Sequence, residues 1–211
     1  MAELDAQTLV IGPPKHGKTS ILHDVCERHL TSYPTGVALV HDVNRQFVDL
    51  CARYENVADY RGKANKAALA GEPFPRGASF GCDTSEIAEL ALELGVLHNE
   101  DTRVTVPILL IYDETSLMET SGSTWVSKLD LKIIANRRHR GIHPAYNLQR
   151  HAGLMDAFFE LATDVCILSQ VSDENTRALE KKIGMKPGAL ARLVGAPKYT
   201  YVHWRQGEGC V

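Results

Sequence analysis

The sequence contains no long apolar stretch. Its longest uninterrupted one, from Val106 to Tyr112, is far shorter than the roughly 20 residues that a membrane-spanning helix requires. The first residues, Met1 to Asp5, also lack the basic region and the apolar segment of a secretory signal. We therefore expect a cytoplasmic protein without a transmembrane helix.

Cysteine pairs with metal-binding spacing are absent as well. The cysteines are scattered without a CxxC motif, which favours reduced, mostly buried thiols over a disulfide framework or a zinc site; they are Cys26, Cys51, Cys82, Cys166 and Cys210. His139 and His143 have the spacing of metal ligands on one helix, but Gly141 and Pro144 argue against a continuous helix there. We expect no zinc site.

Neither sign of charge dominates the composition. The 23 Lys and Arg residues oppose 26 Asp and Glu residues, and the formal net charge of −3 argues against coating nucleic acid through the overall field. Any such binding must therefore be local. Basic residues do cluster in three places, although such clusters are ordinarily solvated faces; the clusters are Arg61 to Lys66, Asn136 to Arg140, and Lys181, Lys182 with Lys186.

The order of apolar segments predicts an α/β fold. At 211 residues the chain is long enough for one such domain and short for two, so we expect a single domain over residues 1–211. Apolar β-formers alternate with helical periods, a pattern typical of a mostly parallel central sheet flanked by helices on both faces. Strands are expected at 8–11, 37–41, 78–80, 107–112, 145–148, 164–168 and 199–204, and Pro144 is tolerable only at the first position of its strand.

Four helices are expected between these strands. The first follows residue 19 and ends at Tyr33 to Gly36, and the second begins with a cap at Thr84 or Ser85 and stops at Gly95. The third runs from about Thr124 to Asn136 and is followed by a basic turn. The fourth runs from Glu174 to Ile183.

A phosphate-binding loop (P-loop) follows the first expected strand and precedes a helix. It reads Gly12-Pro13-Pro14-Lys15-His16-Gly17-Lys18-Thr19. The two glycines allow a sharp turn and a close approach of the backbone to phosphates. The prolines lack N–H groups, so the backbone donors are expected from Lys15 to Ser20, at the helix N-terminus. Lys18 would reach the terminal phosphates of ATP, and the Thr19 hydroxyl would ligate Mg²⁺.

A second motif, the acidic pair Asp113-Glu114, directly follows the apolar strand expected at 107–112. Asp113 is expected to hold Mg²⁺ directly or through its water shell, and Glu114 to orient and deprotonate the attacking water. A solvated strand end is the alternative interpretation. The adjacent glutamate favours hydrolysis over transfer of the phosphoryl group to a small acceptor.

Gln149 ends the next expected strand. Its amide is positioned to reach the γ-phosphate or the attacking water, which makes it a candidate sensor. From position alone, an ordinary polar strand end is equally compatible with this residue.

Taken together, these motifs resemble the FtsK-HerA superfamily of P-loop ATPases. Besides the P-loop, the resemblance rests on Val40 to Asn44, on Ile111 to Glu114, and on the Arg138-His139-Arg140-Gly141-Ile142 block that precedes Gln149-Arg150. It extends from about Gln7 to Gly184. The compact length is similar to that of the genome-packaging ATPases of membrane-containing icosahedral viruses. The resemblance implies a RecA-like P-loop NTPase fold.

The resemblance also implies partners. Relatives translocate double-stranded DNA without sequence preference and assemble as rings, commonly hexamers, in which an arginine of one subunit completes the neighbour's ATP site. Transposed to this sequence, that residue is Arg138 or Arg140. Arg61, Lys63 and Lys66 are candidate pore contacts with DNA. A capsid vertex or portal protein is a further implied partner, and the implied location is the host cytoplasm or the virion vertex.

Two other functions share the P-loop. A small P-loop kinase that phosphorylates a nucleotide or a metabolite would use Lys18 and Thr19, but the Asp113-Glu114 pair and the lack of an obvious arginine-rich lid argue against it. A non-motor assembly ATPase of the same superfamily would be expected to carry a membrane span. The sequence therefore favours a DNA-translocating, genome-packaging ATPase.

Overall fold

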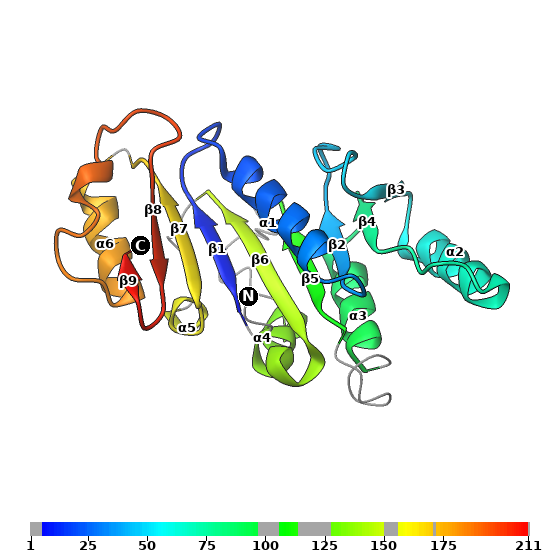
Figure 1. Cartoon of the computed structure of the whole chain (residues 1–211). Coiled ribbons are helices and arrows are strands. Elements are labelled where there is room, and N and C mark those ends of the chain that lie inside the picture. The colour runs from blue at the N-terminus through cyan, green and yellow to red at the C-terminus, as the bar shows by residue number, and fades with distance from the viewer. Residues whose placement is uncertain (1–5, 97–105, 114–127, 150–155, 171, 211) are drawn as a thin grey trace.

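One nine-stranded sheet forms the centre of the molecule. The computed structural model describes residues 6–96, 106–113, 128–149, 156–170 and 172–210. The strand order is β3-β4-β2-β5-β6-β1-β7-β8-β9, and neighbouring strands are parallel except at β7-β8 and β8-β9 (Figure 1). The strands are β1 (Thr8–Ile11), β2 (Val37–His41), β3 (Ala52–Tyr54), β4 (Gly77–Phe80), β5 (Ile108–Tyr112), β6 (Ile142–Leu148), β7 (Asp164–Leu168), β8 (Tyr201–Arg205) and β9 (Gly209–Cys210).

Helices cover both faces of this sheet, so the expected α/β class is confirmed. They are α1 (Lys18–Ser32), α2 (Val57–Ala70), α3 (Thr84–Gly95), α4 (Lys128–Arg140), α5 (Asp156–Glu160), α6 (Asp173–Ile183) and the short η3 (Ala191–Leu193). α1 covers one face, in front of the sheet in Figure 1, and its Leu22 and Cys26 belong to the smaller apolar cluster there. Apolar side chains of α2 to α6 pack in the larger cluster on the other face.

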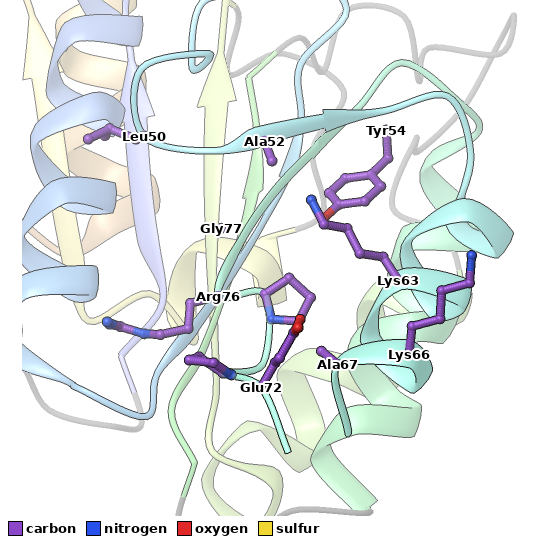
Figure 2. Close-up of a pocket in the computed structure, with 11 residues that line it drawn as sticks. Leu50, Ala52, Tyr54, Lys63, Lys66, Ala67, Glu72, Arg76 and Gly77 are labelled. Atoms are coloured by element: carbon purple, nitrogen blue, oxygen red, sulfur yellow. The ribbon is translucent and has the colours of Figure 1, made fainter. Parts of the chain in front are cut away.

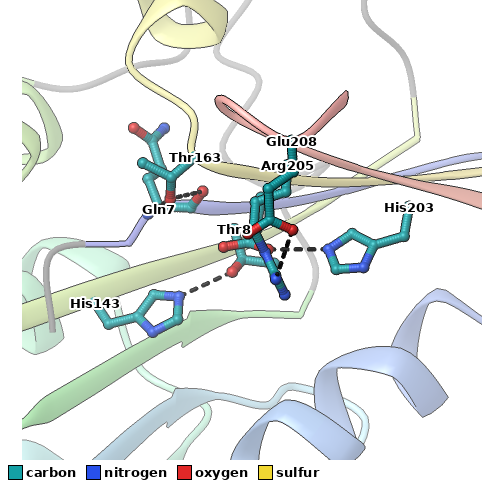
Figure 3. A network of polar contacts seen from close by, with 8 residues as sticks. Gln7, Thr8, His143, Thr163, His203, Arg205 and Glu208 are labelled. Atoms are coloured by element: carbon teal, nitrogen blue, oxygen red, sulfur yellow. Dashed lines mark hydrogen bonds and ion pairs between the residues drawn. The ribbon is translucent and has the colours of Figure 1, made fainter. Parts of the chain in front are cut away.

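Polar side chains tie the strands together at the amino-terminal edge of the sheet. Thr8 Oγ1 of β1 lies 2.8 Å from His143 Nε2 of β6 (Figure 3). Asp164 of β7 lies 2.9 Å from His203 Nε2 and accepts a 3.2 Å hydrogen bond from Arg205 Nε, both on β8. Burial alone would raise the pKa of Asp164, but these hydrogen bonds outweigh it and lower the pKa. This network fixes the sheet at the edge opposite the P-loop.

β6 begins before Pro144, so the expectation that this proline opens the strand was wrong. The carbonyl of Leu148 accepts a 3.0 Å hydrogen bond from the amide of Gly12, so Leu148 faces β1. Alternate residues of a strand face the same neighbour, and Pro144 therefore faces β1 as well. β1 begins only at Thr8, opposite Ala145. The missing N–H of Pro144 thus removes no hydrogen bond from the ladder between the two strands.

The basic residues after position 136 lie in a helix, which corrects the expected basic turn. α4 continues to Arg140 and ends at Gly141, whose φ is 63°. Cations in the last turn of a helix favour this extension because they oppose the partial negative charge there. Arg137 is buried and donates to the carbonyls of Ile134 and Leu161. Residues 124–127, where this helix was expected to begin, lie outside the described residues.

The N-cap of α3 and the elements β3 and α2 also differ from expectation. The N-cap of α3 is Asp83, rather than Thr84 or Ser85, and its carboxylate accepts a 2.7 Å hydrogen bond from the amide of Ser85. β3 and α2 were not expected. β3 is three residues long and exposes Ala52, while α2 buries only four of its residues, so neither has a strong apolar pattern.

Three of the five cysteines lie in the interior of the protein. All five cysteines are free, and Cys26, Cys51 and Cys166 are buried. The Sγ atoms of Cys26 and Cys51 lie 3.8 Å apart between α1 and the segment before β3. Within the described ranges, none of the helices has both the length and the apolar character needed to cross a bilayer.

Candidate nucleotide site

The P-loop joins the end of β1 to the start of α1. Its first residue is fixed by the hydrogen bond from the amide of Gly12 to Leu148 on β6. Lys15 and Gly17 both have left-handed backbones, with φ of 63° and 96°. This conformation costs little at glycine and is uncommon elsewhere. Two left-handed residues in one short loop curl the backbone around the helix end, as a phosphate cradle requires.

The start of α1 faces this curled loop. The amide of Ile21 makes the first helical hydrogen bond, to the carbonyl of Gly17 over 3.2 Å. The amides of Thr19 and Ser20 precede it and point out of the helix end. The first turn of α1 contains no acidic side chain, and Gly17 at the N-cap supplies no side-chain acceptor. The positive end of the helix is therefore available for an anion.

Lys18 lies inside the loop rather than in solvent. Its side chain is buried, and Nζ donates 2.8 Å hydrogen bonds to the carbonyls of Gly12 and Pro13. These two carbonyls hold the ammonium group at the centre of the cradle. An ammonium in this position can neutralise bound phosphate oxygens as a point charge.

Thr19 and Asp113 meet across the sheet. β6 separates β1 from β5, yet the Thr19 hydroxyl donates a 2.9 Å hydrogen bond to Oδ1 of Asp113. Asp113 is buried, and its amide donates to the carbonyl of His41 on β2. A hydroxyl and a carboxylate are the hard oxygen donors that Mg²⁺ prefers. The two residues expected to hold Mg²⁺ therefore share one position beside the P-loop and fit this ion chemically.

Asn147 is a site residue that the sequence did not reveal. It is the penultimate residue of β6 and is buried between Asp113 and the P-loop strand. Its Nδ2 donates to the backbone carbonyl of Asp113 and, over 3.1 Å, to Oδ1 of the same residue. The signal in the sequence was a polar residue near the end of an expected strand. In the structure that strand is almost wholly buried, Asn147 included. Asn147 holds the Asp113 carboxylate toward Thr19.

Two stacked tyrosines support this arrangement on the other face of the sheet. Tyr112 precedes Asp113 and Tyr146 precedes Asn147, and their rings lie 5.1 Å apart at an angle of 17°. Burial, and the nearby Asp130, raise the pKa of both tyrosines far above the usual value. Both rings are therefore neutral and tightly packed, which sets the spacing of the two polar residues that follow them.

Of the other two expected catalytic residues, Gln149 is among the described residues and Glu114 is not. Gln149 follows β6 directly and lies level with Gly12, because Leu148 pairs with Ile11. The candidate sensor is therefore beside the first residue of the P-loop. Glu114, the expected general base, lies outside the described residues.

The two candidate trans arginines lie at the opposite edge of the sheet. Arg138 is exposed, whereas Arg140 is partly buried and its Nη1 donates a 3.0 Å hydrogen bond to the carbonyl of Leu92 in α3. The seven residues of β6 separate them from the P-loop edge, which is about 20 Å at the rise of a strand. Neither arginine therefore lies at the P-loop of its own chain.

The expected pore cations lie at the far end of the sheet. Arg61, Lys63 and Lys66 are on α2, beyond the edge strand β3. Arg61 forms an ion pair with Glu93, and Lys63 Nζ lies 5.6 Å from the centre of the Tyr54 ring. A cavity of about 580 Å³ lies beside them, lined by α2, β3 and the segment before β4 (Figure 2). This cavity is separate from the P-loop.

Asp42, at the carboxyl end of β2, has a structural role. Its Oδ1 accepts a 2.8 Å hydrogen bond from the amide of Gln46, and its Oδ2 accepts a 3.0 Å hydrogen bond from the amide of Phe47. Both carboxylate oxygens thus close the loop after β2.

Comparison with solved structures finds proteins with a similar fold. The genome packaging NTPase B204 from Sulfolobus turreted icosahedral virus 2, in complex with ATP-gammaS, matches with a TM-score of 0.71 and 14% sequence identity over 98% of this chain and 95% of that chain. B204 from Sulfolobus turreted icosahedral virus, a DNA-packaging ATPase, matches with a TM-score of 0.66 and 14% identity over 95% and 92%. The chain has the fold of these P-loop ATPases. The resemblance drawn from the motifs is confirmed at the level of the fold.

A cellular secretion ATPase shares the fold over part of its length. The cytoplasmic domain of the type VII secretion ATPase EccC from Thermomonospora curvata matches with a TM-score of 0.62 and 13% identity over 98% of this chain and 23% of that chain. Comparisons with protein-family models and with curated protein sequences find no match. The similarity of this chain to known proteins therefore rests on its fold.

Proposed function

We propose that this protein is a Mg²⁺-dependent ATPase that uses ATP hydrolysis to drive duplex DNA into a preformed capsid. The observation that carries the ATPase part is the contact between Thr19 and Asp113 beside a P-loop whose lysine lies inside the cradle. The binding of ATP-gammaS by a packaging NTPase of the same fold and similar length supports the choice of nucleotide.

Each residue has a separate task in this proposal. Backbone amides from Lys15 to Ser20 hold the phosphates, and Lys18 neutralises their terminal oxygens. Thr19 and Asp113 would hold Mg²⁺, whose positive charge would stabilise the negative charge that develops on the phosphate oxygens as the bond to the γ-phosphate breaks. Asn147 keeps Asp113 directed toward Thr19.

Water activation and phosphate sensing complete the site. Glu114 follows Asp113 in the sequence, and we assign it the role of general base that removes a proton from the attacking water. Gln149, level with the first residue of the P-loop, is assigned to sense the γ-phosphate or the water. A carboxylate and an amide suit these roles because one accepts a proton and the other both donates and accepts hydrogen bonds.

The motor part of the proposal needs a ring. The distance between Arg138 or Arg140 and the P-loop of the same chain favours an assembly in which one subunit's arginine edge meets the next subunit's P-loop edge. Head-to-tail contacts form a ring when the rotation between subunits closes on itself, and we propose a hexamer. DNA would be bound through its phosphates, without sequence preference, and a capsid vertex or portal protein would be the docking partner.

The decisive experiment measures ATP hydrolysis with and without duplex DNA, for the wild-type protein and for Glu114→Gln. We expect DNA to stimulate hydrolysis, the stimulation to fall steeply with salt, and Glu114→Gln to bind ATP without hydrolysing it. Rapid phosphorylation of a small acceptor without DNA stimulation would contradict the motor and favour a kinase. Normal hydrolysis by Glu114→Gln would contradict only the assignment of the base.

A further inference from the structure

An aromatic side chain lies against the P-loop on the side away from Asp113. Tyr199 belongs to the segment between η3 and β8, and two of its ring carbons are 2.7 and 3.2 Å from the position that a Cβ on Gly17 would take. Leu168, the last residue of β7, lies against the same loop: its Cβ is 2.8 Å from the position of a Cβ on Gly12. The loop is therefore flanked by an apolar wall on its β7 side.

The backbone holds Tyr199 in this place. Its φ is 69°, a left-handed value that is uncommon for a bulky residue. The next residue, Thr200, donates to the carbonyl of Pro197 over 3.2 Å and accepts a 2.8 Å hydrogen bond from the amide of Ser169. The Tyr199 side chain is nevertheless 68% exposed. A conformation of this kind persists only where the surroundings impose it, and such residues concentrate at ligand sites.

The two sides of the P-loop differ in chemistry. The contact between Thr19 and Asp113 marks the β5 side as the place for the metal and the terminal phosphates. A nucleotide bound with its γ-phosphate on that side must extend its nucleoside toward the opposite side. β7 and β8 form that side, because β1 lies between β6 and β7. There the exposed Tyr199, next to Gly17, provides a flat aromatic surface.

We propose that Tyr199 is the platform on which the base of the bound nucleotide stacks. The inference rests on the proposed nucleotide binding and adds a residue that determines affinity for the nucleoside part. Stacking on a tyrosine ring needs only the flat face of a base, so it supplies affinity without strong discrimination between bases. The P-loop then provides the phosphate contacts and Tyr199 the base contact.

Two substitutions separate the ring from the backbone. Tyr199→Asn removes the ring and keeps a residue type that tolerates a left-handed φ. Tyr199→Phe keeps the ring and removes the hydroxyl. Leu69→Asn is the matched control, because it removes another apolar side chain, 91% exposed on α2 and remote from the P-loop. The full-length chain is used throughout.

The measurement compares binding of ATP and of tripolyphosphate, each with Mg²⁺, by titration calorimetry. We expect Tyr199→Asn to weaken ATP binding by at least about fivefold and to leave tripolyphosphate binding within about twofold of wild type, the difference being the lost stacking. Tyr199→Phe and Leu69→Asn should bind both ligands as the wild type does.

Three results would overturn the inference, and they differ from one another. Unchanged ATP affinity in Tyr199→Asn would show that the base lies elsewhere while the ATPase proposal stands. An equal loss for ATP and tripolyphosphate would show that the ring acts on the P-loop through Gly17. Failure of the wild-type protein to bind either ligand would overturn the nucleotide site itself.

Discussion

The hydroxyl of Thr19 donates a 2.9 Å hydrogen bond to the carboxylate of Asp113, although 94 residues separate them in the chain. The strand order creates this contact, because β6 places the ends of β1 and β5 at the same edge with one strand between them. Two oxygen donors from different strands thus converge beside the P-loop lysine.

Removing the Thr19 hydroxyl should strongly reduce metal-dependent hydrolysis. For Thr19→Val we expect the hydrolysis rate to fall about a hundredfold, equivalent to ~3 kcal/mol of lost transition-state stabilisation, because the side chain can no longer ligate Mg²⁺. Thr19→Ser keeps the hydroxyl and should retain most of the activity. Steady-state phosphate release over a range of Mg²⁺ concentrations checks this. Equal rates for the valine and serine variants would exclude the hydroxyl from metal binding.

Replacement of Asn147 should weaken the metal site without removing a ligand. In Asn147→Ala, Asp113 loses both hydrogen bonds that Asn147 Nδ2 donates to it. Partners that orient a ligand are typically worth about 10- to 100-fold in metal affinity or activity, and we expect a loss in that range. The readout is the Mg²⁺ concentration for half-maximal hydrolysis, which should rise, while metal-free ATP binding stays constant. A fall in rate without any change in Mg²⁺ requirement would argue against a positioning role.

His29 should make stability depend on pH. Burial in α1, with Arg76 nearby, lowers its pKa from the usual 6.5 to about 4. Between these values the unfolded chain binds a proton that the folded chain does not. The free energy of unfolding should therefore fall as the pH decreases from 6.5 to about 4, by on the order of 3 kcal/mol.

Chemical denaturation at several pH values tests this dependence. His29→Gln should flatten the slope in that window, whereas His139→Gln, at an exposed position, should leave it as in the wild type. A slope that is the same in His29→Gln and the wild type would show that other groups cause it.

A trans-acting arginine should allow two inactive variants to complement each other. Arg138→Ala or Arg140→Ala keeps an intact P-loop, and Glu114→Gln keeps the arginines. Mixed in equal amounts before assembly, they should restore roughly a quarter of the wild-type hydrolysis rate, because one ring interface in four then combines both intact parts. Activity no higher than the sum of the separate variants would exclude action in trans.

The choice between the two arginines needs a stability measurement. Arg140 anchors α4 to the carbonyl of Leu92, so Arg140→Ala is expected to unfold at a lower temperature whether or not the residue acts in trans. Arg138 is exposed, and Arg138→Ala should unfold as the wild type does. Complementation by one variant and not the other identifies the acting residue.

Much of the fold was predictable because the strands carry strong local signals. The apolar runs that became β1, β2, β5 and β7 are buried along most of their length, so composition alone distinguishes them. The P-loop was predictable because its glycines and its lysine occur at fixed spacing between a strand and a helix. α2 and β3 were missed because their sequences are largely polar or exposed.

The remaining site residues depend on contacts that a single sequence does not encode locally. Asn147 acquires its role only because β6 lies between β5 and β1, and the order of strands is a property of the whole sheet. Tyr199 lies far from Gly17 in the chain, and it is near the P-loop only because β8, which begins two residues later, starts opposite Leu168 at the end of β7. The prediction for Pro144 was wrong because a proline inside a strand is tolerated where the neighbouring strand has not yet begun, and a single sequence does not show where that is.

The position of β6 has a mechanical consequence. Its first residue follows the helix that carries Arg138 and Arg140, and its last residues are Asn147 and Leu148, beside Asp113 and the P-loop. The strand is paired on both sides, so it is stiff along its axis and cannot take up a displacement by bending. A shift of Asn147 must move the arginine end as well or break the ladder. β6 is thus a single rigid connection between the edge of the sheet that carries the P-loop and the opposite edge, which carries the basic end of α4.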